Sequence, residues 1–298
     1  MNEPARPSLE TLRDWIGRTE ARRDTLTAAP LAGLAATLDR ADDPPPAAGT
    51  ALPPLAHWLY FLPQAPQHEI GVDGHPKRGG FLPPVPLPRR MWAGGRLRFE
   101  RALKVGDAVE RVSTIQSVET KHGRSGALVF VTVRHEVSDA HGVALTEEHD
   151  IVYRDNPLPG AAAPTPAVAP TDETFSRAVT PDPVLLFRYS ALTFNGHRIH
   201  YDRPYVTEVE GYPGLIVHGP LIATLLLDLL RVRLARERPA TTVRAFEFKA
   251  ASPLFDIHPF TVCGRFAADT DTDATPSATL WARDHLGQLA MQARAELA

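Results

Sequence analysis

The chain has 298 residues, and its 32 Lys and Arg against 35 Asp and Glu give a formal net charge of −3. At about 150 residues per domain, this length predicts two domains or one large one. The near balance of charge argues against a partner such as nucleic acid or an anionic membrane, and the single cysteine, Cys263, excludes a disulfide framework and a thiolate metal cluster.

Neither the N-terminus nor any internal stretch predicts export or membrane insertion. The first 15 residues carry charges of both signs and lack the apolar core of a signal or transit peptide. The most apolar stretch, 221–230, is far shorter than the roughly 20 residues that a membrane span needs. We therefore expect a cytoplasmic protein in which Cys263 is a small buried hydrophobic residue.

The first half predicts one helix, an irregular region and a sheet. Apolar residues at helical spacing predict an amphipathic helix within 8–27. Proline-rich segments at 43–54 and 82–88 can continue neither a helix nor a central strand, and they bracket an irregular region. Four segments rich in β-branched and aromatic residues then predict three successive hairpins in an antiparallel sheet, at 97–103, 108–120, 127–137 and 143–154.

The second half repeats this pattern after a Pro/Ala-rich segment, 157–173, which is typical of a linker. A helix is predicted at 182–193, and a stronger one at 219–236 begins with Gly219 and Pro220. The repeat distance of about 145 residues indicates one unit used twice. It predicts halves at 1–156 and 174–298, and the second half has four predicted strands, at 241–250, 258–266, 277–283 and 287–297.

The densest group of ionisable and small residues lies in the loops before the stronger helix, at 193–202 and 211–219. His200 is the candidate general base, because imidazole titrates near neutral pH. Asn195 can hold a water or a carbonyl through its amide. Gly219 begins the helix, where free N–H groups and the helix dipole can stabilise an oxyanion. His197 and His200 lack a third ligand at helical spacing, which argues against a metal site.

These residues resemble a known family. TFNGHRIHYD (193–202) followed by IVHGPLIATLL (216–226) resembles the hydratase motif of the MaoC-like hydratases and dehydratases. The layout of the whole chain is similar to the type 2 hydroxyacyl-thioester dehydratases, and within them to mesaconyl-C4-CoA and itaconyl-CoA hydratases. The segments that carry this wider similarity are HWLYF (57–61), RRMWAGGRLRF (89–99) and VRAFEFKAASPLF (243–255).

The resemblance implies an α+β fold, the double hot-dog, in which two curved antiparallel sheets, each wrapped on a helix, form one pseudo-dimeric unit. The active site would lie at the seam between the halves. In the first half the proline-rich 43–88 occupies the place of the central helix, so we expect a degraded helix and space for the acyl-CoA tail there. We also expect Trp58, Tyr60, Phe61 and Trp92 to build the core of this half more than a substrate pocket.

The resemblance also implies a hydro-lyase that adds water reversibly to the double bond of a short unsaturated acyl-CoA. The leading substrate is a C5 dicarboxylic thioester, mesaconyl-C4-CoA or itaconyl-CoA, with citramalyl-CoA as product. No metal and no cofactor beyond the substrate's own CoA is implied, and a homodimer is expected. The site would use His200, Asn195 and Gly219 in catalysis, His197, Asp202 and His218 in support, and Arg198, Arg89, Arg90 and Tyr205 to bind substrate or CoA.

Asn195 departs from the wider family, which has an aspartate paired with the histidine at this position. An amide cannot relay a proton. Either His200 works on one water held by Asn195, or His197 or Asp202 supplies the acid, or hydration activity is lost; we favour the first. The alternative functions are a 3-hydroxyacyl-thioester dehydratase of fatty-acid or polyketide synthesis, a thioesterase, and a non-catalytic acyl-CoA-binding protein.

Overall fold

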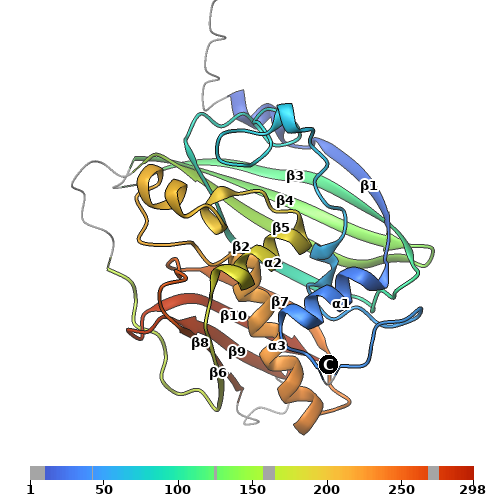
Figure 1. Ribbon diagram of the computed structural model, residues 1–298. Coiled ribbons are helices and arrows are strands. Elements are labelled where there is room, and N and C mark those ends of the chain that lie inside the picture. The colour runs from blue at the N-terminus through green and yellow to red at the C-terminus, as the bar shows by residue number, and fades with distance from the viewer. Residues whose placement is uncertain (1–10, 42, 124–125, 157–164, 268–274) are drawn as a thin grey trace, which may run out of the picture.

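A ten-stranded antiparallel sheet runs through the computed structural model, which describes all residues except 1–10, 42, 124–125, 157–164 and 268–274 (Figure 1). The strand order is β1-β3-β4-β5-β2-β7-β10-β9-β8-β6. The strands are β1 (Thr19–Thr25), β2 (Arg89–Phe99), β3 (Ala108–Gly123), β4 (Gly126–Asp139), β5 (Gly142–Arg154), β6 (Phe175–Val179), β7 (Val243–Ala250), β8 (Phe260–Phe266), β9 (Ser277–Arg283) and β10 (Leu289–Leu297).

The same topology occurs twice. Strands β1 to β5 lie in the order first, third, fourth, fifth, second, and β6 to β10 repeat this order from the opposite edge. A helix follows the first strand of each set, α1 (Ala28–Thr37) after β1 and α2 (Pro183–Thr193) after β6. The long α3 (Gly219–Glu237) has no equivalent in the first set, because 43–88 contains only the 3-10 turns η2 (Ala56–Leu59) and η3 (Gln67–Glu69). The expected loss of one central helix is therefore confirmed.

Helix α3 is buried along most of its length and lies on the same side of the sheet as α1 and α2 (Figure 1). It packs on β6 and β8 to β10. Its one buried charge, Asp228, accepts hydrogen bonds from Arg40 (2.7 Å to Nε) and Arg177 (2.8 Å), and Arg231 lies 3.4 Å away. Because Arg40 follows α1, this cluster connects the first strand set to the central helix of the second.

The two strand sets meet where β2 pairs with β7. On its other side β2 pairs with β5, so it lies inside the sheet. A Cβ atom at Gly94 would lie 2.5 Å from the carbonyl oxygen of Phe248, which means that this close approach requires glycine.

The structure corrects two predictions for the first half. The helix at 8–27 is wrong from Thr19 on, because 19–25 is strand β1, whose side chains alternate in exposure as they pair with β3; before it lies the 3-10 turn η1 (Thr11–Trp15). The hairpin from β2 to β3 is also wrong, since β2 pairs with β5 and β7. The linker lies partly outside the described residues, but Ala169 is buried and its N–H donates to the carbonyl oxygen of Gly287.

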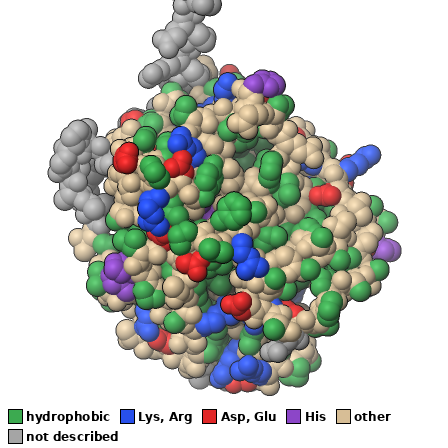
Figure 2. All heavy atoms as spheres, in the orientation of Figure 1, with side chains coloured by type: hydrophobic (Ala, Val, Ile, Leu, Met, Phe, Trp, Pro, Cys, Tyr) green, Lys and Arg blue, Asp and Glu red, His purple; other side chains and the backbone are tan. Residues whose placement is uncertain are grey.

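The other predicted helices and strands are confirmed within a few residues, except that β2 begins at Arg89 instead of position 97. Helix α1 and strand β6 were not predicted. Cys263 is fully buried, as expected. The surface in Figure 2 mixes acidic and basic side chains among hydrophobic ones. None of the helices in the described part of the chain is long and apolar enough to cross a membrane.

Candidate active site

A strip of polar side chains crosses the inner face of the first strand set, between two hydrophobic clusters. On β4, Val133 belongs to one cluster and Val137 to the other, with His135 between them. The strand register aligns His135 with Ser113 on β3 and with Glu147 on β5. The sheet therefore places ionisable groups where a continuous core would otherwise form.

A cavity of about 190 Å³ opens over this strip. Its wall includes side chains from the first strand set and from the residues around α2 and α3, so it lies where both sets contribute. The aromatic residues expected as core, Trp58, Tyr60, Phe61 and Trp92, form part of its wall, and Tyr60 and Phe61 are buried. The other lining residues are His57, Leu62, Pro63, Arg111, His135, Glu147, His149, Tyr189, Thr193, Asn195 and Pro220.

Glu147 is the buried acid of the cavity, with only 3% of its surface exposed. Its carboxylate accepts hydrogen bonds from His57 Nε2 (2.9 Å) and from Trp58 Nε1 (3.1 Å). Burial alone would raise its pKa, but the hydrogen bond and charge of His57 lower the pKa of Glu147 to about 2. Glu147 is therefore a carboxylate at neutral pH, and it fixes both rings in the cavity wall.

The other two imidazoles of the strip are neutral. Burial lowers the pKa of His135 to about 3 and that of His149 to about 4. The Nδ1 atom of His135 lies 2.8 Å from Ser113 Oγ, and the His149 ring stacks on Trp92 with their centroids 4.0 Å apart. Both rings can give or accept hydrogen bonds to a ligand without adding charge.

Asn195 reaches the cavity from the end of α2. The preceding Phe194 adopts a left-handed conformation (φ 48°), and the N–H of Asn195 donates to Ser190 O at 2.8 Å, which ends the helix. The Asn195 Oδ1 atom accepts a hydrogen bond from the backbone N–H of His197 at 3.0 Å. Its amide NH₂ group makes no hydrogen bond to the described residues, so it can hold a water or substrate oxygen.

His200 is buried and does not line the cavity. Its Nδ1 atom lies 2.7 Å from the carbonyl oxygen of Ile216. Because a carbonyl only accepts, Nδ1 carries the proton and the lone pair is on Nε2. Burial lowers the pKa of His200 to about 4, so the ring is neutral at neutral pH. It stacks on His218 at 3.7 Å, and His218 Nε2 lies 2.8 Å from Ser190 Oγ.

Gly219 begins α3 directly after His218, and the next residue, Pro220, lines the cavity. Among the described residues, the backbone N–H groups of Gly219 and Leu221 donate no hydrogen bond. No atom lies within 4 Å of the position that a Cβ at Gly219 would occupy. The helix start therefore carries N–H donors that are not used by the described residues, as an oxyanion hole requires.

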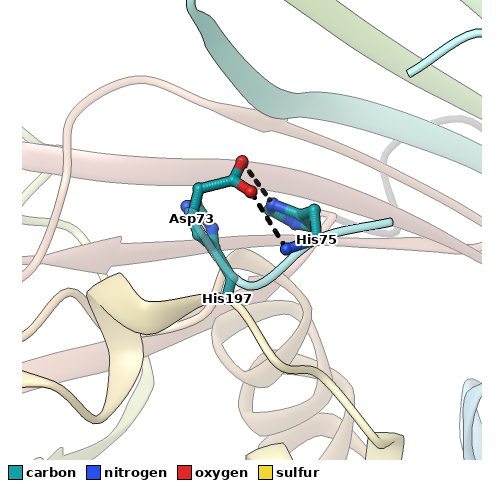
Figure 3. Close-up of side chains that lie close together, drawn as sticks. All are labelled: Asp73, His75 and His197. Carbon is teal, nitrogen blue, oxygen red and sulfur yellow. Dashed lines mark hydrogen bonds and ion pairs between the residues drawn. The ribbon is translucent and has the colours of Figure 1, made fainter. Parts of the chain in front are cut away.

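His197 joins a cluster that the sequence did not predict, with Asp73 and His75 from the irregular region (Figure 3). Their possible metal-binding atoms lie within 4.8 Å of one another. Asp73 accepts hydrogen bonds from the backbone N–H and the Nδ1 of His75, at 3.0 and 3.1 Å. The charges of Arg90 and Arg78 help to lower the pKa of His75 and would repel a cation. That the site uses no metal stays a prediction.

The remaining candidate residues do not line the cavity, and each has a partner within the protein. Arg198 donates to Asp202 (2.7 and 2.9 Å) and covers the ring of Tyr205 at 4.1 Å. The hydrogen bond from Arg198 lowers the pKa of Asp202. Asp202 is therefore an ionised carboxylate that is already bound by Arg198. Burial raises the pKa of Tyr205 to about 12. The two other arginines are also occupied, Arg89 by Tyr212 Oη (2.7 Å) and Asn156 Oδ1 (2.9 Å), and Arg90 by Tyr153.

Of the three residues predicted for catalysis, Asn195 lines the cavity, while His200 and Gly219 do not, and their catalytic roles stay predictions. The sequence did not predict the first-half wall of the cavity. A signal was present on β5, where every second residue from 145 to 153 faces inward and two of these, Glu147 and His149, are ionisable. An alternating strand with ionisable residues on its apolar face predicts a buried polar site.

Comparison with known proteins identifies relatives over most of the chain. The family model for hydroxyacyl-thioester dehydratase type 2 matches residues 55–256. The mesaconyl-C(4)-CoA hydratase of Chloroflexus aurantiacus is 49% identical over 84% of this chain and 88% of its own. The mitochondrial hydroxyacyl-thioester dehydratase type 2 of Schizosaccharomyces pombe is 29% identical over 74% of this chain and 83% of its own.

Solved structures share the fold at low sequence identity. A MaoC-like dehydratase aligns over 97% of this chain and 98% of its own with a TM-score of 0.70 and 14% identity. A Mycobacterium tuberculosis protein described as a double hotdog fold aligns over 98% of both chains, with a TM-score of 0.58 and 15% identity. The expected α+β double hot-dog is therefore confirmed.

Proposed function

Because the chain belongs to the hydroxyacyl-thioester dehydratase type 2 family of hydro-lyases, we propose that it adds water reversibly to the double bond of a short dicarboxylic acyl-CoA. The observation that carries the choice of substrate is the cavity. At about 190 Å³ it is smaller than the roughly 300–1,000 Å³ of common ligand sites, and its wall holds Glu147, Arg111 and three imidazoles. Such a wall suits a short polar acyl group better than a fatty chain.

The thioester end of the substrate binds at the start of α3 in this proposal. Its carbonyl oxygen accepts a hydrogen bond from the free N–H of Gly219, which stabilises the enolate that forms when the β-carbon is attacked. The amide NH₂ of Asn195 holds the attacking water beside the double bond. Hydroxyl adds to the β-carbon and a proton to the α-carbon, so mesaconyl-C4-CoA would give citramalyl-CoA.

His200 is the proposed base, since its Nδ1 proton is bound by Ile216 O and its Nε2 lone pair accepts no hydrogen bond from the part of the chain that the structure describes. It removes a proton from water and returns it to the α-carbon. The rival for this role is His57, which lines the cavity and is oriented by the Glu147 carboxylate, an arrangement typical of catalytic imidazoles. Single variants distinguish the two.

The test is a substrate screen with purified protein. Chromatography and mass spectrometry measure the rate of hydration of each thioester. We expect mesaconyl-C4-CoA or itaconyl-CoA to be hydrated faster than crotonyl-CoA and faster than a long-chain 2-enoyl-CoA. His200→Gln should lower kcat by about 10²- to 10⁴-fold, and His57→Gln is its matched comparison. If only His57→Gln abolishes turnover, the base is His57.

A second candidate is dehydration of 3-hydroxyacyl thioesters in chain synthesis, which the similarity to the Schizosaccharomyces pombe protein favours. A preference for straight-chain monocarboxylic substrates would support it and contradict the dicarboxylic proposal. Release of free CoA would indicate a thioesterase. Tight binding of these thioesters with no turnover would indicate a binding protein.

A further inference from the structure

Arg111 is the charged residue of the cavity that lacks a partner. It lies on β3, and its side chain lines the cavity together with Asn195. Within the described part of the chain its guanidinium makes no hydrogen bond and no ion pair, and its Nε is buried without an acceptor. Its guanidinium lies over the ring of Phe61, 5.0 Å from Cζ to the ring centroid.

Other arginines that could bind an anion are already occupied. On the outer face, Arg96 pairs with Glu148 and Asp150 at 2.6 and 2.7 Å. Arg198, Arg89 and Arg90 have the partners described above. Arg111 therefore stands out as a guanidinium with free donors beside the predicted reaction centre.

The neighbours of Arg111 do not neutralise it. Glu147 lies in the same cavity wall, but its oxygens accept from His57 and Trp58. The charge of Glu20 raises the pKa of Arg111, but this carboxylate lies 3.4 Å from Arg22 and makes no ion pair with Arg111 among the described residues. Arg22, which pairs with Arg111 across β1 and β3, adds a second positive charge, and burial together with this charge lowers the pKa of Arg111. A half-buried cation whose Nε has no acceptor among the described residues is unfavourable, so the cavity favours an anionic occupant.

We propose that Arg111 is the residue that selects a dicarboxylic acyl group, by binding its free carboxylate. A guanidinium matches a carboxylate with two parallel hydrogen bonds, which would fix the acyl group with its double bond toward Asn195 and Gly219. Neutral His135 and His149 can donate further hydrogen bonds to the same carboxylate. This inference rests on the proposed function and names the group that sets its specificity.

The test compares two thioesters that differ only in this carboxylate: mesaconyl-C4-CoA and 3-methylcrotonyl-CoA, in which a methyl group replaces it. For Arg111→Leu we expect kcat/KM with mesaconyl-C4-CoA to fall by about 100-fold or more, and that with 3-methylcrotonyl-CoA to change by less than about threefold. Arg111→Lys should recover part of the loss. Arg23→Gln, which removes an exposed arginine paired with Glu110 at 2.8 Å, is the control and should match the wild type.

The Arg111→Leu variant should fold, because replacing a half-buried cation that makes no ion pair among the described residues should leave the melting temperature unchanged or raise it. An equal loss on both substrates, or an unchanged preference for mesaconyl-C4-CoA, would overturn the inference and leave the proposed function standing. A second measurement tests anion binding by Arg111 independently of turnover. Free mesaconate should raise the melting temperature of the wild type and leave that of Arg111→Leu unchanged. If mesaconate stabilises only the wild type but no dicarboxylic thioester is hydrated, the proposed function is wrong, while the assignment of Arg111 as a carboxylate-binding residue stands. If neither effect is seen, both are wrong.

Discussion

Mild acid should destabilise this protein before its carboxylates titrate, because several imidazoles are buried in the neutral form. Burial lowers the pKa of His135 to about 3, and of His149 and His200 to about 4. In the unfolded chain each titrates near its usual value of about 6.5. As pH falls through that value, the unfolded state takes up protons that the folded state does not, so stability that is complete above it is progressively lost.

The magnitude follows from these pKa values. At about pH 5.5 each of the three rings lowers the free energy of unfolding by about 1.4 kcal/mol relative to neutral pH. Together the three rings lower it by about 4 kcal/mol. That is a large part of the about 5–15 kcal/mol that stabilises a typical domain. Around this pH the free energy of unfolding should fall by about 1.2 kcal/mol per pH unit for each ring.

Urea denaturation followed by tryptophan fluorescence between about pH 7.5 and pH 5.5 measures this slope. His149→Phe keeps the stacking on Trp92 and removes one titrating ring, so its slope should be smaller by about 1.2 kcal/mol per pH unit. The exposed His141 provides a control, and His141→Asn should keep the wild-type slope. A free energy of unfolding that is constant over this range, or a His149→Phe slope equal to that of the wild type, would refute the reasoning.

Four further substitutions test other parts of the structure. Gly219→Ala should fold with an unchanged melting temperature, because its methyl group meets no atom within 4 Å, but kcat/KM should fall about 10- to 100-fold if that space receives the thioester oxygen. Asn195→Ala should lower kcat by about 100-fold with stability unchanged, and wild-type turnover would contradict its role in holding water. Asp228→Asn should cost about 3 kcal/mol in urea denaturation while folded molecules keep full activity, because it removes the buried charge that partly buried Arg40 and Arg177 share; a loss below about 0.5 kcal/mol would show that the cluster is solvated. Glu147→Gln should destabilise by about 2 kcal/mol, since the charged acceptor of His57 is lost, and equal stability would contradict the assignment of a buried carboxylate.

Local sequence was sufficient to predict those helices and strands whose own residues determine their secondary structure. The Gly219 and Pro220 start and the apolar run after it specify α3, and alternation specifies β8 to β10. Strand β1 was missed because its Glu and Arg are good helix formers, and only pairing with β3 makes it a strand. Its identity depends on a partner about 90 residues away in the chain.

The site was predictable in its second-half part and not in its first-half part. Asn195, His200 and Gly219 lie close in sequence, so one motif contains them all. Arg111 and Glu147 lie on different strands, and they share a cavity only through the strand register. A shift of one residue would turn each side chain to the opposite face. The alternation of β5 alone can therefore indicate that Glu147 faces inward, but not that Arg111 shares its cavity.

The open sheet also has a consequence for solubility. A ten-stranded sheet that does not close leaves two edges with unpaired N–H and C=O groups, and such edges recruit strands from other chains. Here one edge is β1, with four charged residues in TEARRDT, and the other is β6, which has only five residues. The charges of β1 and the short length of β6 discourage the pairing of these edges with strands of other molecules. The protein should therefore resist edge-to-edge aggregation although its sheet is open.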